Sequence, residues 1–223
     1  NGVIKIIWDY ELDLPLDKLF NELIDFWKIE FPNLDFSKKE VLNDLIEFLV
    51  QRIVSHLEEI SLSKELIKAL YSSDEFSQKR ILNIVDLKNR VKSIVNFKEK
   101  ETFFEIQKVI TRVSKLANSS NLSTEVLSIG DYVNTKLFEK DCELKVFEFI
   151  KELEKLYSKG SCDYLKLLNL FEININTIED LFDNEKGVLV MTEDMKVRNN
   201  RLNLLSLIRN YSLKIADFTL LNS

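Results

Sequence analysis

The stretch SKKEVLNDLIEFLVQRIVSHL, residues 37–57, decides the fold class. Its apolar side chains recur at intervals of three and four residues, which places them on one face of an α-helix. Ser37 stands three residues before Glu40, and this S-x-x-E pattern is typical of a capping box at a helix start. The stretch therefore predicts an amphipathic helix that runs to about residue 59.

The same periodicity returns along most of the chain, so the predicted fold class is all-α. Pro15 suits the first turn of a helix, and Ser61 or Ser63 suits the cap of another. Thr177 and Thr192 are the predicted caps of the last two helices. Further helices are expected over residues 15–27, 62–70, 81–95, 103–116, 144–157, 161–170, 178–182 and 193–211, with a terminal turn over 216–221.

The segments between these helices are short or polar. Residues 117–130 are the least structured stretch, and residues 183–187 form a loop. The apolar run at 188–191 fits either an extended segment or a buried link.

Composition excludes several classes of protein. Four Gly and two Pro in 223 residues cannot supply the turns of a many-stranded β-protein. The glycines are isolated, which excludes Gly-rich phosphate loops. One His and two Cys exclude a His-rich metal site, an HD-type phosphohydrolase centre, a zinc ribbon and a disulfide framework.

The chain is expected to be soluble and cytoplasmic, with no membrane partner. No stretch approaches the length of an apolar membrane span. The chain opens NGVIKIIWDY, without a Met and without a basic n-region, and we interpret this start as a cut inside a longer protein.

No catalytic residue and no metal site are predicted. His56 is interpreted as a surface or boundary histidine rather than a base, because no nucleophile accompanies it. Cys142 and Cys162 are interpreted as small buried hydrophobes. Acidic pairs are interpreted as residues on solvent-exposed faces. Glu193-Asp194 also lies in the first turn of a predicted helix, where negative charge complements the helix dipole.

The last predicted helix differs from the rest of the chain in charge. The chain has a net charge of −6, yet between Met195 and Lys214 it has five basic residues and no acidic one. A phosphate-facing patch is one interpretation. The other is a structural role at the rim of the core, because Leu202 and Leu205 share the arc of Arg198, Arg201 and Arg209.

The run VLVMTEDMKVRNNRLNLL, residues 188–205, resembles a known closing signature. It is similar to the end of the helical, DALR-type anticodon-binding domain of class I arginyl-tRNA synthetases. The same domain closes the β subunit of bacterial tetrameric glycyl-tRNA synthetase. The ending IADFTLL, residues 215–221, resembles the ADxSxL ending of the glycyl β-subunit family.

Weaker matches follow the same order along the whole chain. Arg112-Val113-Ser114 resembles the opening of that domain, and residues 133–144 resemble its VN…LF…E…L stretch. Residues 1–16 resemble the end of the β subunit's HD-like helical region, whose metal dyad has no counterpart here. The chain departs from the family at Leu181-Phe182, where two Phe are usual, and in three extra residues, 185–187.

The resemblance implies two domains and a function. Residues 1–100 would end the HD-like region, and residues 101–223 would form the anticodon-binding domain. The chain would be the tRNA-binding part of a glycine–tRNA ligase, which charges tRNA with glycine. ATP and Mg²⁺ would act at the α subunit of an α2β2 enzyme, so this segment would hold no cofactor.

The residues expected to bind tRNA are Lys196, Arg198, Asn200, Arg201 and Arg209 on the last helix, with Arg112 and Lys115 on the opening helix of the domain. Arg201 is also the residue with the strongest structural interpretation. Two alternatives stay open: the anticodon domain of an arginyl- or cysteinyl-tRNA synthetase, and a helical protein-interaction scaffold without enzymatic activity.

Overall fold

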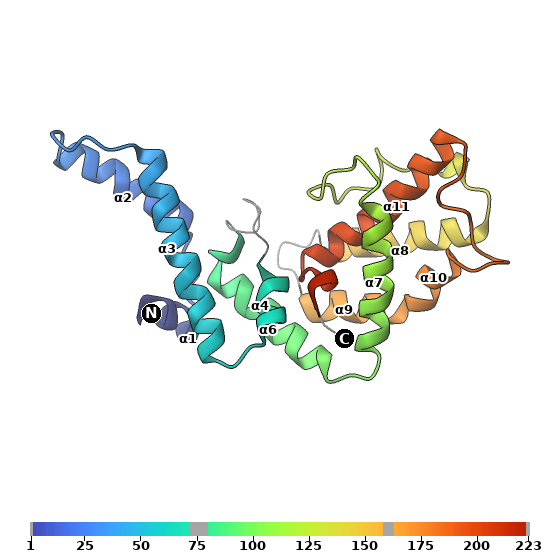
Figure 1. The fold of residues 1–223 in the computed structure, drawn as a ribbon, viewed down its shortest axis with the longest axis horizontal. Helices are drawn as coiled ribbons and strands as arrows, with labels where there is room; N and C mark the ends of the chain where they lie inside the picture. Colours follow the sequence, from blue (N-terminus) through green and yellow to red (C-terminus); the bar gives the residue numbers. More distant parts are fainter. Residues whose placement is uncertain (1, 72–79, 158–162, 222–223) are drawn as a thin grey trace. The chain divides into compact units, whose positions relative to one another are not determined.

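The computed structural model describes residues 2–71, 80–157 and 163–221. In these ranges the regular secondary structure is α-helix and 3-10 helix, with no strand, so the predicted all-α class is confirmed (Figure 1). The chain divides into two compact units, Asn1–Lys92 and Ser93–Ser223, here called the N-terminal and C-terminal units. The division falls inside helix α6 (Ile84–Lys98), and the sequence-based boundary at residues 100 and 101 stays a prediction.

The N-terminal unit is built from helices α1 to α4 and the first part of α6. The helices are α1 (Gly2–Tyr10), α2 (Leu16–Glu30), α3 (Lys38–Glu59) and α4 (Lys64–Leu70). Ser37 accepts a hydrogen bond from the Glu40 amide and Ser63 accepts one from the Leu66 amide, which confirms these two caps. Pro15 is the residue before the first turn of α2 rather than a member of it.

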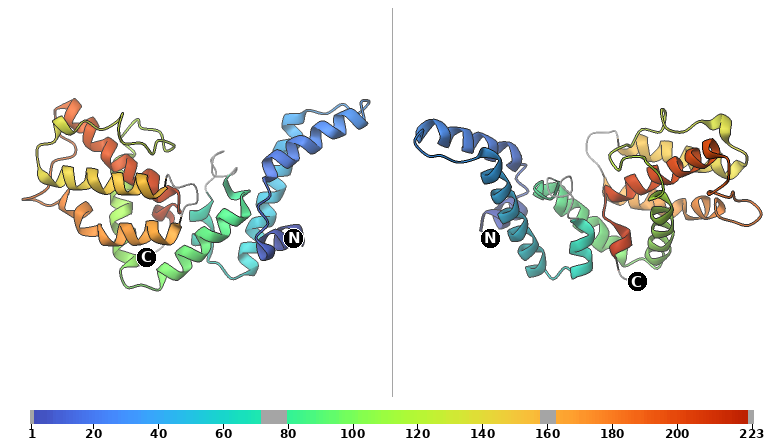
Figure 2. Two further views of the ribbon diagram at one scale, coloured as in Figure 1. Left: turned by 180° about the vertical axis from the view of Figure 1, so that it is seen from behind. Right: turned by 45° about the horizontal axis from the view of Figure 1, so that its top comes forward.

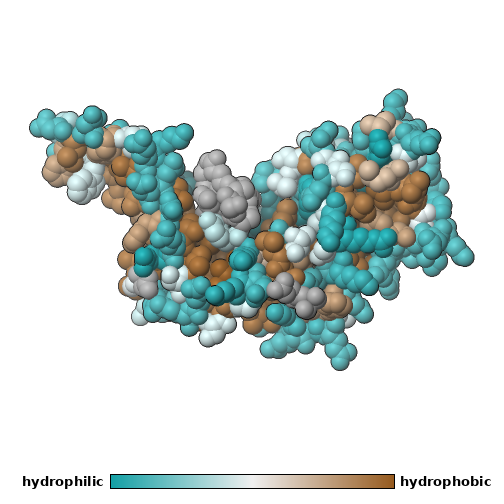
Figure 3. All heavy atoms as spheres, viewed as in Figure 1, coloured by the Kyte–Doolittle hydropathy of each residue, from teal (hydrophilic) through white to brown (hydrophobic). Residues whose placement is uncertain are grey.

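Helix α2 leaves a large part of its apolar surface uncovered in this unit. Phe26, Trp27 and Ile29 are each more than half exposed, and apolar colour reaches the surface of this part of the chain in Figure 3. By contrast, Ile53 and Leu57 of α3 are buried, on the half of that helix that follows Val50. The core of this unit therefore lies at the end of α3 that packs against α1 and α4.

The C-terminal unit is a bundle around helix α11. Its helices are α7 (Phe103–Ala117), α8 (Asp141–Tyr157), α9 (Tyr164–Ile173), α10 (Ile175–Asp180) and α11 (Met195–Leu213), with 3-10 turns η1 (Thr135–Leu137) and η2 (Phe218–Leu220). Helix α11 crosses α7 and packs against it and against α8 (Figures 1 and 2). Almost every side chain of α11 from Asn200 onward is buried, so this helix is the centre of the unit.

Two predicted helix starts are wrong, by two and three residues. Asp194, not Thr192, caps α11, because its carboxylate accepts from the Lys196 and Val197 amides. A carboxylate at this position also complements the helix dipole. Thr177 lies inside α10, which begins at Ile175. The predicted start of α9 at residues 161–163 agrees with the structure at Asp163, whose carboxylate accepts from the Lys166 amide, while Ser161 and Cys162 lie outside the described residues.

The three extra residues 185–187 fold into a tight, self-supporting turn. One carboxylate oxygen of Asp183 accepts from the Glu185 and Lys186 amides, each at 2.8 Å. The Gly187 amide donates to the Asp183 carbonyl, and the Val188 amide donates to the Leu181 carbonyl. A Cβ at Gly187 would lie 2.5 to 2.6 Å from backbone atoms of Asp183 and Leu181, so only glycine fits this approach.

Residues 118–134 are mostly irregular, in agreement with the prediction for residues 117–130. The run 188–191 is also non-helical, with Val190 buried and Leu189 exposed. In the described ranges, no helix is long and apolar enough to cross a membrane.

Candidate nucleic-acid interface

Arg201 is a structural residue at the centre of the C-terminal unit. Its side chain is 2% exposed, and its Nε donates to Glu143 Oε1 at 2.8 Å. Its Nη2 donates to Glu139 at 2.6 Å, and its Nη1 donates to the Leu189 carbonyl at 3.1 Å. Glu143, fully buried, also accepts from the amides of Glu139 and Lys140. The guanidinium therefore ties α11 to the start of α8 and to the run 188–191.

Arg209 holds the irregular segment that follows α7. Its Nη1 donates to the Ala117 carbonyl at 3.2 Å and its Nη2 donates to the Leu122 carbonyl at 3.1 Å. The next residue, Asn210, donates to the carbonyls of Ser123 and Val126. Burial lowers the pKa of Arg209, since the charged form loses water there.

Asn200 is also engaged inside the protein. Its Oδ1 accepts from the Asn134 amide at 2.7 Å and its Nδ2 donates to the Asn134 carbonyl at 3.1 Å. Both hydrogen-bonding groups of the side-chain amide are thus satisfied by one backbone residue. Asn200, Arg201 and Arg209 are buried and bonded to the protein, so we assign them to the fold and leave them out of the interface.

The two remaining expected residues of α11 lie near its first turn. Lys196 is exposed, and Arg198 is half-buried with its guanidinium against the Met195 sulfur. Of the five basic residues of this segment, Lys214 is buried and pairs with Glu125 at 3.5 Å. The basic surface expected from the last helix is therefore reduced to these two side chains.

The opening helix of the unit carries a more continuous basic face. Arg112 and Lys115 are exposed on α7, and Lys108 lies one turn before them on the same side. Lys108 is not among the residues expected from the sequence to bind tRNA. The signal for it is present, because residues 106–124 include three basic side chains and no acidic one.

These side chains line a groove between α7 and η2. Besides the three cations, it is lined by Phe104, Gln107 and Thr111 of α7 and by Thr219 and Leu221, and its volume is about 440 Å³. Among the described residues, Lys108 and Lys115 form no ion pair, and the Arg112 guanidinium lies 4.2 Å from the centre of the Phe182 ring. We call this feature, with its eight lining residues, the α7 groove.

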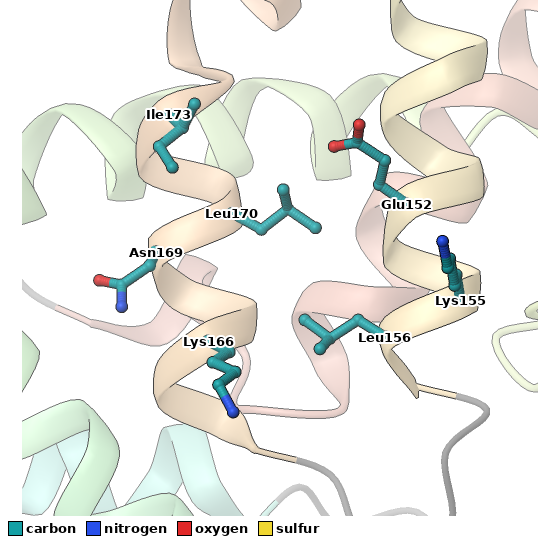
Figure 4. Close-up of a pocket in the computed structure, with 7 residues that line it drawn as sticks. All are labelled: Glu152, Lys155, Leu156, Lys166, Asn169, Leu170 and Ile173. Atoms are coloured by element: carbon teal, nitrogen blue, oxygen red, sulfur yellow. The ribbon is translucent and has the colours of Figure 1, made fainter.

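A second hollow lies between α8 and α9 and has a different character. Its walls carry Leu156, Leu170 and Ile173, with Asn169 and charged side chains of both signs, Glu152, Lys155 and Lys166 (Figure 4). Its volume is about 310 Å³. Lys166 pairs with Asp163 at 3.0 Å. Mixed charge around an apolar floor suits RNA less well than the α7 groove does.

His56 and Cys142 line neither of these hollows. His56, interpreted from the sequence as a surface or boundary histidine, is 4% exposed, and its ring packs edge-on against Trp8. Burial lowers its pKa. Cys142 is buried as predicted, and burial raises its pKa. Over the residues that the structure describes, no group of three His, Cys, Asp or Glu could hold a metal ion.

The relatives found by comparison with known proteins all carry the same name, and each matches nearly the whole chain. No protein-family model matches. A glycine–tRNA ligase β subunit of Picosynechococcus is 31% identical over 98% of the chain, and one of Acaryochloris marina is 29% identical over the same share. One of Clostridioides difficile is 25% identical over 98% of the chain. The chain spans only about 30% of the length of these relatives.

Each of these relatives is named as a subunit of an aminoacyl-tRNA ligase. Within that class, the chain belongs to the family of glycine–tRNA ligase β subunits, of which it represents a segment. The family resemblance deduced from the closing motif is confirmed. The relatives are named for glycine, rather than for the arginine or cysteine of the alternative enzymes.

Proposed function

We propose that this chain is the tRNA-contacting part of a glycine–tRNA ligase β subunit and binds the anticodon arm of glycine-specific tRNA. The observation that carries the proposal is the similarity to β subunits over 98% of the chain. The basic α7 groove supports it, because cations position the phosphates of a bound RNA.

In this proposal the chain supports the ATP-dependent esterification of tRNA with glycine but does not touch glycine or ATP. Adenylate formation, with its ATP and Mg²⁺, belongs to a separate α subunit of a cytoplasmic α2β2 enzyme. Binding energy from the anticodon arm would then hold the distant acceptor end in place for the α subunit.

The test separates tRNA binding from adenylate formation. The complete β subunit, assembled with its α subunit, is compared with the double variant Arg112→Ala, Lys115→Ala. Loss of two phosphate contacts should raise the KM for tRNA about tenfold. Glycine-dependent exchange of pyrophosphate into ATP should stay unchanged, because that reaction needs no tRNA.

The matched control is Lys18→Ala, Lys39→Ala, which removes the same charge from exposed positions of the N-terminal unit. This variant should charge tRNA with unchanged KM. The proposal would be refuted if an enzyme that lacks the whole chain still charged tRNA. It would also be refuted if the variant Arg112→Ala, Lys115→Ala lost the exchange reaction together with tRNA charging.

A further inference from the structure

We propose that the α7 groove holds one unstacked base of the RNA against the ring of Phe104, while the adjacent basic side chains contact the phosphates beside that base. The inference deepens the proposed function and rests on it. It assigns the reading of a nucleotide to a residue outside the closing motif of the chain.

Phe104 has the position of a stacking platform. It lies in the first turn of α7 and is 55% exposed, although it follows directly on the buried Phe103. The Phe103 ring packs 6.5 Å from the Phe97 ring and 6.3 Å from the Phe218 ring, measured between centroids. Phe103 thus anchors the helix, and the face of Phe104 stays available to a partner. Exposed aromatic rings beside cations commonly stack unpaired RNA bases.

The cations continue from Phe104 along the same face of the helix. Lys108, Arg112 and Lys115 follow it at intervals of four, four and three residues, which keeps all four side chains on one side of α7. The only acidic residue of α7 is Glu105, and it is exposed next to Phe104. An RNA strand laid along this face would meet one aromatic ring and then three positive charges.

The opposite wall of the groove is fixed before any ligand arrives. Phe218 and Leu221 are buried, the Gln107 amide donates to the Leu221 carbonyl, and the Thr111 hydroxyl donates to the Phe218 carbonyl. This wall belongs to the ending 215–221 that the sequence analysis singled out. A preformed groove binds a base without first losing conformational entropy of its own.

Thr219 gives this wall a polar edge. It is exposed, and its hydroxyl donates to Asp217 at 2.6 Å, so the hydroxyl oxygen keeps acceptor capacity toward the groove. The Asp217 carboxylate also accepts from the Thr219 amide, which commits that oxygen to capping η2. The groove thus offers an aromatic face, an acceptor and three cations.

The experiment couples the aromatic ring to a single base. A synthetic anticodon stem-loop of glycine-specific tRNA is prepared intact and with an abasic sugar at each loop position in turn. Each RNA is titrated with the full chain and with its Phe104→Ala variant. At one loop position, the abasic RNA should bind the unchanged chain about tenfold more weakly than the intact RNA does. The Phe104→Ala variant should bind these two RNAs with equal affinity.

Three variants refine the result. Phe104→Trp should restore the base dependence, since it keeps an aromatic face. Lys108→Ala should weaken every RNA alike and reduce the slope of log affinity against log salt by about 0.7, whereas Phe104→Ala should leave that slope unchanged. Phe26→Ala removes an equally exposed ring from α2 and should change nothing.

The outcomes distinguish the two proposals. In one outcome, the unchanged chain binds the intact stem-loop, while the losses of affinity from Phe104→Ala and from each abasic position simply add. That result would overturn the groove assignment and leave the proposed function standing. Absence of any binding by the unchanged chain would overturn both. Thermal unfolding of the Phe104 variants should match that of the unchanged chain, because the Phe104 side chain is more than half exposed.

Discussion

At the residue scale, the ion pair of Arg201 with the fully buried Glu143 is a strong constraint on the C-terminal unit. Arg201→Ala should lower the free energy of unfolding by about 3–5 kcal/mol, because it leaves a buried carboxylate without its partner. Urea denaturation followed by circular dichroism measures the loss. Lys145→Ala breaks the exposed pair with Asp141 on the neighbouring helix and should cost about 0–1 kcal/mol. Equal effects of the two changes would contradict the structural role of Arg201.

His56 makes the N-terminal unit sensitive to acid. The side chain is 4% exposed, and both ring nitrogens lack hydrogen-bond partners in the described structure. Its pKa is lowered by burial, which outweighs the opposing charge of Glu59. The unfolded chain therefore takes up a proton near pH 6.5 before the folded one does, and stability falls as the pH drops below that value. His56→Phe should remove this pH dependence between pH 7 and 5.5, measured by urea denaturation at each pH.

At the scale of elements, helix α11 organises the irregular segment that follows α7. Asn210→Ala removes hydrogen bonds to the carbonyls of Ser123 and Val126 and should cost about 1–3 kcal/mol. Amide hydrogen exchange should accelerate over residues 118–130 more than in α8. Asn199→Ala, an exposed position of the same helix, is the control and should change neither quantity. Unchanged exchange in the Asn210 variant would show that the segment is held by other contacts.

Periodicity was enough to predict most of the helices, because most of them bury one face, although α11 is buried almost all round from Asn200 onward. It was not enough to predict the role of the cations on α11. Arg209 and Arg201 have the residue type and charge of a phosphate contact, yet most of their partners are carbonyls and carboxylates that lie 58 to 92 residues away in the chain. Such pairing depends on tertiary packing, which no local pattern encodes. On α7 the reverse holds, since Lys108 was predictable from its acid-free surroundings but was overlooked beside the larger cluster of charge.

At the scale of the whole molecule, the net charge of −6 opposes RNA binding, whereas the basic α7 groove favours it. Screening confines exposed charges to a range of about 8 Å at physiological salt, so the local groove should dominate RNA binding over the chain total. Three cations on a single-stranded loop should give a slope of log affinity against log salt of about −2. Asp17→Asn with Glu22→Gln raises the net charge to −4 from exposed positions on α2 and should leave both the slope and the affinity unchanged. Fluorescence anisotropy of a labelled stem-loop over a salt series measures both. A slope that changes with this pair of residues from the N-terminal unit would mean that binding follows the overall charge, and the α7 groove would then not be the RNA site.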